Sequence, residues 1–125
     1  MTHPDLTQLP LDKVEQEILA SKEIIEDALG MLVSTFAYPY GRYNDLVREV
    51  VKRNFTCACS DKLGLTRMGS DPYTIERVDS YYLRTDKLFS LTMTRLFPWY
   101  IRARSIPRYI RRASIPGLRY FTKTR

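Results

Sequence analysis

The sequence is poor in the residues that most often build reactive or membrane-spanning structures. One histidine, one tryptophan and two cysteines occur among 125 residues. No stretch approaches the roughly 20 apolar residues that cross a bilayer. The first residues show neither the basic segment nor the apolar core of a secretion signal. The location therefore stays unknown, with a cytoplasmic or membrane-peripheral protein favoured.

The scarcity of cysteine and histidine also limits metal and disulfide chemistry. Cys57 and Cys59 are two residues apart, so in a strand both side chains point to one face and the straight backbone is poorly suited to a bridge between them. We expect two free thiols, which favours a reducing compartment. With His3 as the only histidine, a Cys/Cys/His metal site is disfavoured.

Acidic residues are missing from the last third of the chain. Residues 1–86 contain all 14 acids and 10 of the 20 basic residues, a sum of −4, whereas residues 87–125 contain the other 10 basic residues and no acid, a sum of +10. Aromatic residues alternate with arginines from Phe97 onward. This pattern predicts that residues 97–125 bind an anionic surface such as a membrane. The alternative is an extension whose aromatic residues dock on the parent domain, and without a recognised motif no nucleic acid is expected.

What is present before residue 84 has the pattern of an α/β protein. Apolar residues recur at helical spacing over residues 10–29, Gly30 is suited to a helix end, and residues 31–38 resemble a buried strand. Asn44 is suited to cap a second helix that ends at Asn54, and a second strand follows at residues 55–60. This order is typical of a parallel sheet. A third helix is expected from Thr85, and two later prolines are expected to prevent one long helix.

The first predicted strand stops abruptly at Pro39-Tyr40-Gly41. A proline and a glycine after a strand expose backbone N–H groups at its carboxyl end, where α/β proteins place their ligand sites. Position alone therefore marks this turn as a candidate site. The other interpretation of Tyr38 and Tyr40 is that they are packing aromatics at a strand end.

Two motifs here resemble those of the polysaccharide deacetylases, carbohydrate esterase family four with its NodB-homology domain. Phe36-Ala37-Tyr38-Pro39-Tyr40-Gly41 resembles the third motif of that family. Thr2-His3-Pro4-Asp5-Leu6 resembles the end of the second motif, His-(Ser/Thr)-x-x-His-Pro, and Glu17-Ile18 follows at similar spacing. The resemblance covers about residues 1–80 and the C-terminal part of the domain only.

The resemblance implies a partial, distorted (β/α) barrel of the polysaccharide deacetylase type over residues 1–84, with a basic helical C-terminal extension at 85–125. It implies a hydrolase that removes acetyl groups from a polysaccharide or acetylated amino sugar with zinc or another divalent metal. His3 matches a metal ligand. Tyr40 matches the residue whose backbone N–H binds the oxyanion, and Pro39, Tyr40 and Gly41 would bind the substrate.

The chain also departs from the family pattern. The Asp-Asp motif and the first histidine of the second motif have no counterpart, a later Leu-x-His is missing, and Ala37 stands where the family often has arginine. Enzyme activity in this chain is therefore uncertain, and we expect weak metal binding. The alternative function is a catalytically silent fragment whose basic tail binds an anionic surface.

Overall fold

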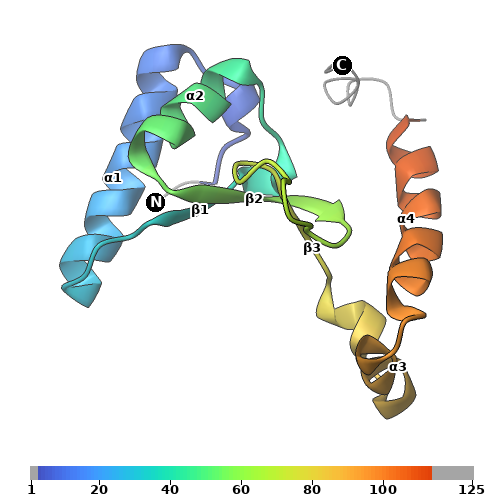
Figure 1. Cartoon of the computed structure of the whole chain (residues 1–125). Coiled ribbons are helices and arrows are strands. Elements are labelled where there is room, and N and C mark those ends of the chain that lie inside the picture. Colours follow the sequence, from blue (N-terminus) through green and yellow to red (C-terminus); the bar gives the residue numbers. More distant parts are fainter. Residues whose placement is uncertain (1–2, 114–125) are drawn as a thin grey trace. The chain divides into compact units, whose positions relative to one another are not determined.

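The computed structural model describes residues 3–113, with side chains to residue 107. The chain divides into two units (Figure 1). The first unit comprises Met1–Asp61 and Met68–Ile75, and the second comprises Lys62–Arg67 and Glu76–Arg125. Each unit is described by itself.

The order of elements is helix, strand, helix, strand, as the sequence predicts. The first part of the chain contains a 3-10 turn η1 (Leu6–Gln8), α1 (Leu11–Leu29), β1 (Thr35–Ala37), a second 3-10 turn η2 (Pro39–Gly41), α2 (Asp45–Asn54) and β2 (Cys57–Leu63). It continues with β3 (Ile75–Arg77), η3 (Ser80–Leu83), α3 (Asp86–Ser90), η4 (Leu91–Met93) and α4 (Phe97–Ala113). The strands are hydrogen-bonded neighbours in the order β1-β2-β3.

The two helices of the first unit begin and end where the sequence predicts. Pro10, in an extended conformation, is the cap residue of α1, and Gly30 ends that helix at φ +63°, which glycine adopts without steric cost. The side chain of Asn44 accepts a hydrogen bond of 2.9 Å from the N–H of Val47 and so caps α2. Lys52 and Arg53 lie in its last turn, where they complement the helix dipole.

β1 and β2 pair in parallel, with Thr35, Phe36 and Ala37 opposite Cys57, Ala58 and Cys59. The connection between them is α2, so the strands and this helix form the β-α-β arrangement that parallel pairing requires. The mixed α/β fold class with a parallel sheet is thus confirmed. Both cysteines are free thiols, as predicted.

The prediction of a buried strand over residues 31–38 is wrong in its extent. β1 spans three residues, of which Thr35 and Ala37 are exposed, and Met31 and Leu32 are also exposed. β1 has only β2 as a neighbour in the described sheet, so nothing in the described part covers its other edge. The second strand is longer than predicted, since β2 runs to Leu63.

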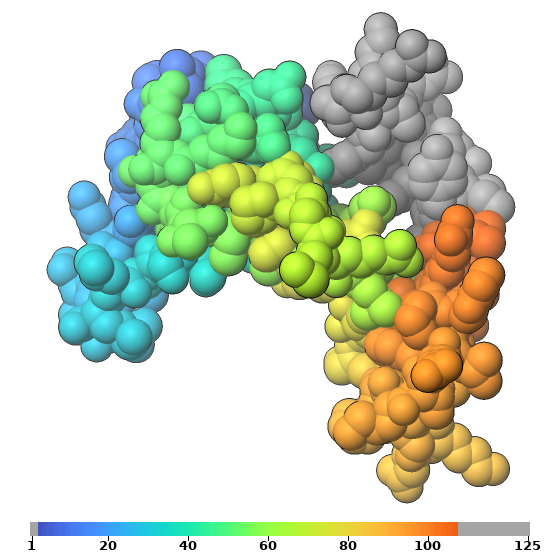
Figure 2. Space-filling model, viewed as in Figure 1, coloured from blue at the N-terminus to red at the C-terminus, as the bar shows by residue number. Residues whose placement is uncertain are grey.

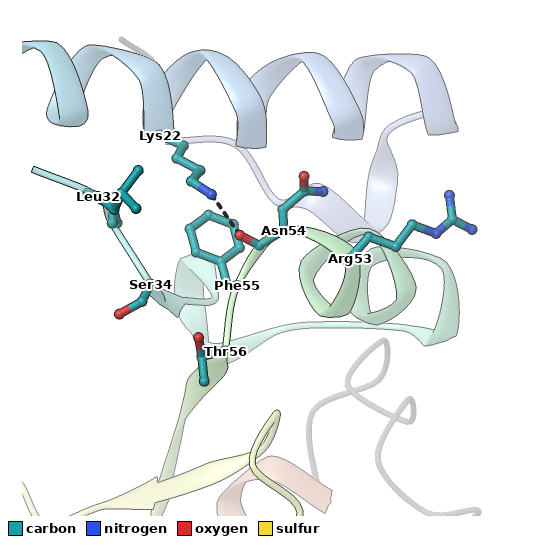
Figure 3. A pocket seen from close by; sticks show the side chains of 8 residues that line it. Lys22, Leu32, Ser34, Arg53, Asn54, Phe55 and Thr56 are labelled. Carbon is teal, nitrogen blue, oxygen red and sulfur yellow. Dashed lines mark hydrogen bonds between the residues drawn. The ribbon is translucent and has the colours of Figure 1, made fainter.

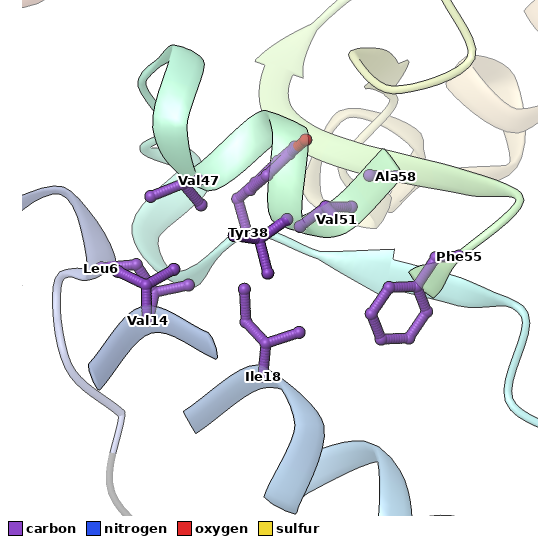
Figure 4. Close-up of a cluster of buried hydrophobic side chains, with 9 residues drawn as sticks. Leu6, Val14, Ile18, Tyr38, Val47, Val51, Phe55 and Ala58 are labelled. Atoms are coloured by element: carbon purple, nitrogen blue, oxygen red, sulfur yellow. The ribbon is translucent and has the colours of Figure 1, made fainter. Parts of the chain in front are cut away.

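The core of the first unit lies between the helices and the two parallel strands. Figure 4 shows Val14 and Ile18 of α1 pointing toward Tyr38, with Val47 and Val51 of α2 beside it. Lys22 lies 5.1 Å from the centre of the Phe55 ring at the rim of this cluster. In the space-filling view the blue and green atoms of α1 and α2 form one continuous packed body (Figure 2).

The second unit has a much smaller interior. Among its described residues only Leu63 and Ile101 are buried. The side chain of Thr85 caps α3 by accepting a hydrogen bond from the N–H of Leu88 at 3.3 Å, which confirms the predicted helix start, but α3 ends already at Ser90.

The expectation that two prolines prevent one long helix is wrong for Pro107. This residue lies inside α4, which runs for 17 residues. A proline removes one backbone donor, and a helix can continue around it by a local bend. Pro116, the other proline, lies outside the described residues.

Candidate functional site

The turn after β1 has an unusual backbone. Tyr40 has φ +55° and ψ +15°, and it is the one residue other than glycine with a positive φ in the described part of the chain. A left-handed conformation costs an ordinary residue about 1 to 2 kcal/mol. Strained residues of this kind concentrate at functional sites. The Pro39-Tyr40-Gly41 turn, which its position in the sequence marks as a candidate site, therefore also has a strained backbone.

One backbone N–H of the strained turn forms no hydrogen bond within the turn. The N–H of Gly41 donates to the carbonyl of Tyr38 at 2.8 Å, and the N–H of Arg42 donates to the carbonyl of Pro39 at 3.0 Å. Within residues 3–113, no backbone bond of this turn uses the N–H of Tyr40. A donor of this type at the carboxyl end of a strand is suited to bind an oxygen that carries negative charge.

Gly41 fixes the shape of the turn through a close approach to β2. It is buried, has φ +63°, and a Cβ atom added there would fall on the side chain of Asp61, closer than real Cβ atoms come to any neighbour. Asp61 thus lies directly against the turn. Only glycine combines this φ with this approach.

The segment that contains His3 lies against the same turn. The hydroxyl of Tyr40 donates to the backbone carbonyl of His3 at 3.1 Å. The two rings meet edge to face, with 5.0 Å between their centres. The structure therefore brings together His3 and Tyr40, which are 37 residues apart in the sequence.

An ion pair between Arg42 and Asp5 joins the same two segments. Nη1 of Arg42 lies 2.6 Å from Oδ2 of Asp5. The other oxygen of Asp5 accepts from the N–H and the hydroxyl of Thr7, at 3.1 and 2.7 Å. Burial by itself would raise the pKa of Asp5. The hydrogen bonds from Thr7 and Arg42 and the charge of Arg42 outweigh this effect, so the pKa lies below its ordinary value. Asp5 is therefore a structural carboxylate that fastens the His3 segment to the turn.

These residues do not complete a metal centre. His3 is exposed, and both oxygens of nearby Asp5 are already engaged by Arg42 and Thr7. No group of three or more histidine, cysteine, aspartate or glutamate side chains suited to a metal ion occurs among residues 3–107. Zinc sites in proteins use three or four protein ligands, so the described residues do not complete such a site around His3.

A shallow concavity of about 320 Å³ lies away from this turn (Figure 3). Apart from Lys22 of α1, its lining residues immediately precede β1 and β2, at the amino ends of the parallel strands, whereas Pro39-Tyr40-Gly41 follows the carboxyl end of β1. Its Lys22 donates to the carbonyl of Asn54 at 2.8 Å, which makes that ammonium part of the local structure. We therefore place the candidate site at the turn.

Sequence reasoning missed the polar side chains that support the site. Asp5 and Arg42 are 37 residues apart, and no motif links them. Arg48 of α2 forms a second ion pair, with Asp71, which is 23 residues away in the sequence. For Asp61 the sequence did offer a way to predict its place. Parallel pairing of β1 and β2 brings the residues that follow Cys59 next to those that follow Ala37.

Comparisons with known proteins agree with this geometry. Residues 1–55 match the family model for polysaccharide deacetylase. A deacetylase of Streptococcus pyogenes, solved in complex with acetate, has 28% sequence identity and a TM-score of 0.59, with 62% of this chain and 35% of that chain covered. A polysaccharide deacetylase of Bacillus cereus has 30% identity and a TM-score of 0.56, with 62% and 25% covered. No curated protein matches.

The α/β fold is thus similar to that of the polysaccharide deacetylases. The match over residues 1–55 and the similarity to solved polysaccharide deacetylases confirm the resemblance carried by the two motifs and support a partial deacetylase domain. It spans about a third of the length of the Streptococcus structure and a quarter of the Bacillus one.

Proposed function

We propose that this chain is part of a hydrolase that removes acetyl groups from a polysaccharide or an acetylated amino sugar. The support is the match of residues 1–55 to the family model, together with the strained turn at the place where the family's third motif falls. The proposed substrate partner is an acetylated glycan. Residues 1–84 would form the deacetylase part and residues 85–125 the basic extension.

The single observation that carries the proposal is the backbone of Tyr40. Its N–H has no turn partner among the described residues, its backbone is left-handed, and the next residue, the buried Gly41, lies directly against Asp61. When an acetyl group is attacked, its carbonyl oxygen becomes negatively charged, and a preorganised N–H stabilises that charge. In this proposal Tyr40 supplies the N–H, while Pro39 and Gly41 shape the surface on which the acetyl group rests.

His3 has a separate proposed role, as one ligand of zinc or another divalent metal. Its contact with the Tyr40 ring places the imidazole beside the turn. The described residues do not provide the further ligands that such a site needs. We therefore assign to this chain one ligand and the oxyanion N–H, and not a complete catalytic site.

Acetate release tests this function. The chain would be assayed on an acetylated chito-oligosaccharide, alone and joined behind the part of the Streptococcus pyogenes deacetylase that precedes the matched region. We expect no release above background from the chain alone and measurable release from the fusion protein. His3→Ala in the fusion should lower the rate by at least about 100-fold, because a metal ligand is lost.

A matched variant separates the backbone role of Tyr40 from its side chain. Tyr40→Ala keeps the N–H and removes the ring, so we expect a loss of rate well below the roughly 100-fold that removal of an oxyanion donor costs. If His3→Ala leaves the rate of the fusion unchanged, or if Tyr40→Ala lowers it as much as His3→Ala does, this assignment of the site is wrong.

A second candidate function is that of a catalytically silent fragment whose residues 97–125 bind an anionic surface. One observation in the described part favours it, because Trp99 is 71% exposed. Residues 114–125, and the side chains from 108 onward, lie outside what the structure describes. No helix in the described part is both long and apolar enough to cross a membrane.

A further inference from the structure

The second unit exposes a run of large apolar side chains. Phe89, Met93, Leu96, Trp99 and Ile106 have exposed fractions of 62, 90, 64, 71 and 55%. They occur within 18 consecutive residues and come from α3, η4 and α4. Single exposed apolar residues are common on proteins, but a concentration of them marks an interaction surface.

On α4 the two exposed large apolar residues, Trp99 and Ile106, lie on one face. Trp99, Arg102, Ala103 and Ile106 are all exposed, and their spacing of three, four and seven residues places them in one stripe along the helix. Ile101 is 2% exposed and lies on the opposite side. Over residues 97–107, the helix thus turns its one fully buried apolar residue inward and presents a tryptophan and an isoleucine outward.

Contacts on the inner side fix this orientation. The hydroxyl of Tyr100 donates to the carbonyl of Tyr82 at 3.0 Å. The guanidinium of Arg104 lies 5.4 Å from the Tyr82 ring centre and 5.9 Å from that of Tyr100. These contacts hold α4 against η3, so that rotation of the helix to bury Trp99 would break them.

Basic residues outnumber the one exposed acidic residue of α3, Asp86, around this face. Residues 87–125 contain 10 lysines and arginines and no acid. Within the described part, Lys87, Arg95 and Arg102 are exposed among the apolar residues. Aromatic and aliphatic side chains interleaved with arginine are typical of helices that lie in the head-group region of an anionic membrane, with the apolar side chains inserted and the guanidinium groups on phosphates.

We propose that Phe89, Met93, Leu96, Trp99 and Ile106, which we call the exposed apolar face, dock the second unit on an anionic lipid bilayer. In this arrangement α4 lies parallel to the membrane surface, Trp99 and Ile106 enter the head-group region, and Arg95 and Arg102 bind lipid phosphates. The proposal is independent of the deacetylase function, because none of these residues belongs to the turn at residues 38–42.

Trp99 provides a direct probe, since it is the only tryptophan in the chain. The full chain would be titrated with vesicles of phosphatidylcholine containing 30% phosphatidylglycerol, at low salt, while tryptophan emission is recorded. We expect a blue shift of the emission and quenching by brominated lipid. Pure phosphatidylcholine vesicles should give neither.

Two pairs of matched variants identify the groups responsible. Ile106→Ser with Leu96→Ser should reduce vesicle binding at least about tenfold, whereas Met31→Ser with Leu32→Ser, equally exposed residues of the first unit, should not change it. The double variant Arg95→Gln/Arg102→Gln should bind anionic vesicles more weakly at low salt. Lys13→Gln with Arg53→Gln removes the same charge from the first unit and should change vesicle binding much less. His3→Ala should bind vesicles like the unchanged chain, even if the deacetylase assignment fails.

Several results would overturn the proposal. Equal binding to neutral and anionic vesicles would contradict the role given to Arg95 and Arg102. Co-sedimentation with vesicles without any change in Trp99 emission would show that the membrane contact does not involve Trp99. A dimer in sedimentation equilibrium that disappears in the Leu96/Ile106 variant would identify the occupant of the face as a second copy of the chain. Tight binding of single-stranded oligonucleotides, with no vesicle binding, would identify it as nucleic acid.

Discussion

The two units use their apolar residues in opposite ways. The first unit buries valine and isoleucine side chains from α1 and α2 against Tyr38 and the parallel strands. Among its described residues, the second unit buries only Leu63 and Ile101 and exposes Phe89, Met93 and Trp99. Hydrophobic burial is the main source of folding free energy. The first unit therefore has the core of a folding domain, whereas the described part of the second unit leaves most of its large apolar side chains exposed, as the proposed binding role requires.

The charges follow the same division. In the first unit, charged residues pair with each other, as Arg42 with Asp5 and Arg48 with Asp71. In the second unit arginines also lie over aromatic rings, as Arg84 does over Tyr81 at 4.5 Å. A basic segment without acids needs an external anion to balance it. This comparison suggests where mutations should act on folding and where they should act on binding.

The largest expected effect on stability comes from the core of the first unit. Ile18 is 1% exposed, and Ile18→Ala should lower the free energy of unfolding by about 2 to 5 kcal/mol, because it leaves a cavity. Ile106→Ala, at 55% exposure in the second unit, should change it by about 0.5 kcal/mol or less. Urea denaturation followed by circular dichroism would measure both, and equal effects would remove the distinction between the units.

The next effect tests the turn with two glycines of the same conformation. Gly30 and Gly41 both have φ +63°, but a Cβ has open space at Gly30 and falls on Asp61 at Gly41. We expect Gly30→Ala to lower the free energy of unfolding by about 1 kcal/mol, from the left-handed backbone alone. Gly41→Ala should add about 1 to 3 kcal/mol for overpacking. Similar values for both variants would show that Asp61 moves away at little cost.

A smaller effect concerns the Arg48–Asp71 pair. Burial raises the pKa of Asp71, but the N–H of Tyr73 and the hydrogen bond and charge of Arg48 lower it below its ordinary value. The carboxylate of Asp71 therefore takes up a proton more readily in the unfolded state than in the folded state. The pair stabilises the fold above about pH 4, and this stability is lost as the pH falls through the lowered pKa. Asp71→Asn should flatten this acid dependence and cost about 1 kcal/mol or less at pH 7. Arg48→Gln should flatten the acid dependence only in part, because the N–H of Tyr73 still lowers the pKa of Asp71, and a steeper acid loss in either variant would contradict this origin.

The smallest effect compares two tyrosine hydroxyls. The hydroxyl of Tyr38 is buried without a hydrogen-bond partner among the described residues, and burial raises the pKa of this side chain. Tyr38→Phe should be neutral within about 0.5 kcal/mol or slightly stabilising. Tyr100→Phe removes the bond to the Tyr82 carbonyl and should cost about 1 kcal/mol. A clear loss of stability in Tyr38→Phe, measured by thermal unfolding, would indicate a water or other partner at that hydroxyl.

Local signals predicted the elements of the first unit well. The caps at Asn44 and Gly30 and the helical spacing of Val14 and Ile18 are encoded within a few residues, so they could be predicted from the sequence. The extent of β1 could not, because burial of residues 31–34 depends on whether a neighbouring strand covers that edge. The path of α4 through Pro107 likewise depends on packing that no local rule describes.

The candidate site was predictable in part. The Pro39-Tyr40-Gly41 turn follows from residue types, and the approach of His3 follows only from the family resemblance. The left-handed Tyr40 and the contact of Asp61 with Gly41 depend on the register of β1 with β2. The Asp5–Arg42 pair depends on a long-range contact, for which a single sequence offers no spacing to interpret.

Zinc titration tests most directly the claim that this chain supplies one ligand of a divided deacetylase site. The chain and its fusion to the preceding part of the Streptococcus pyogenes deacetylase would be titrated by calorimetry at neutral pH, each with and without His3→Ala. We predict weak binding to the chain, a tight one-to-one site in the fusion, and a loss of about 10- to 100-fold in the affinity of that site when His3 is replaced. A tight site in the chain alone that survives His3→Ala, or a fusion whose affinity ignores the substitution, would contradict the account.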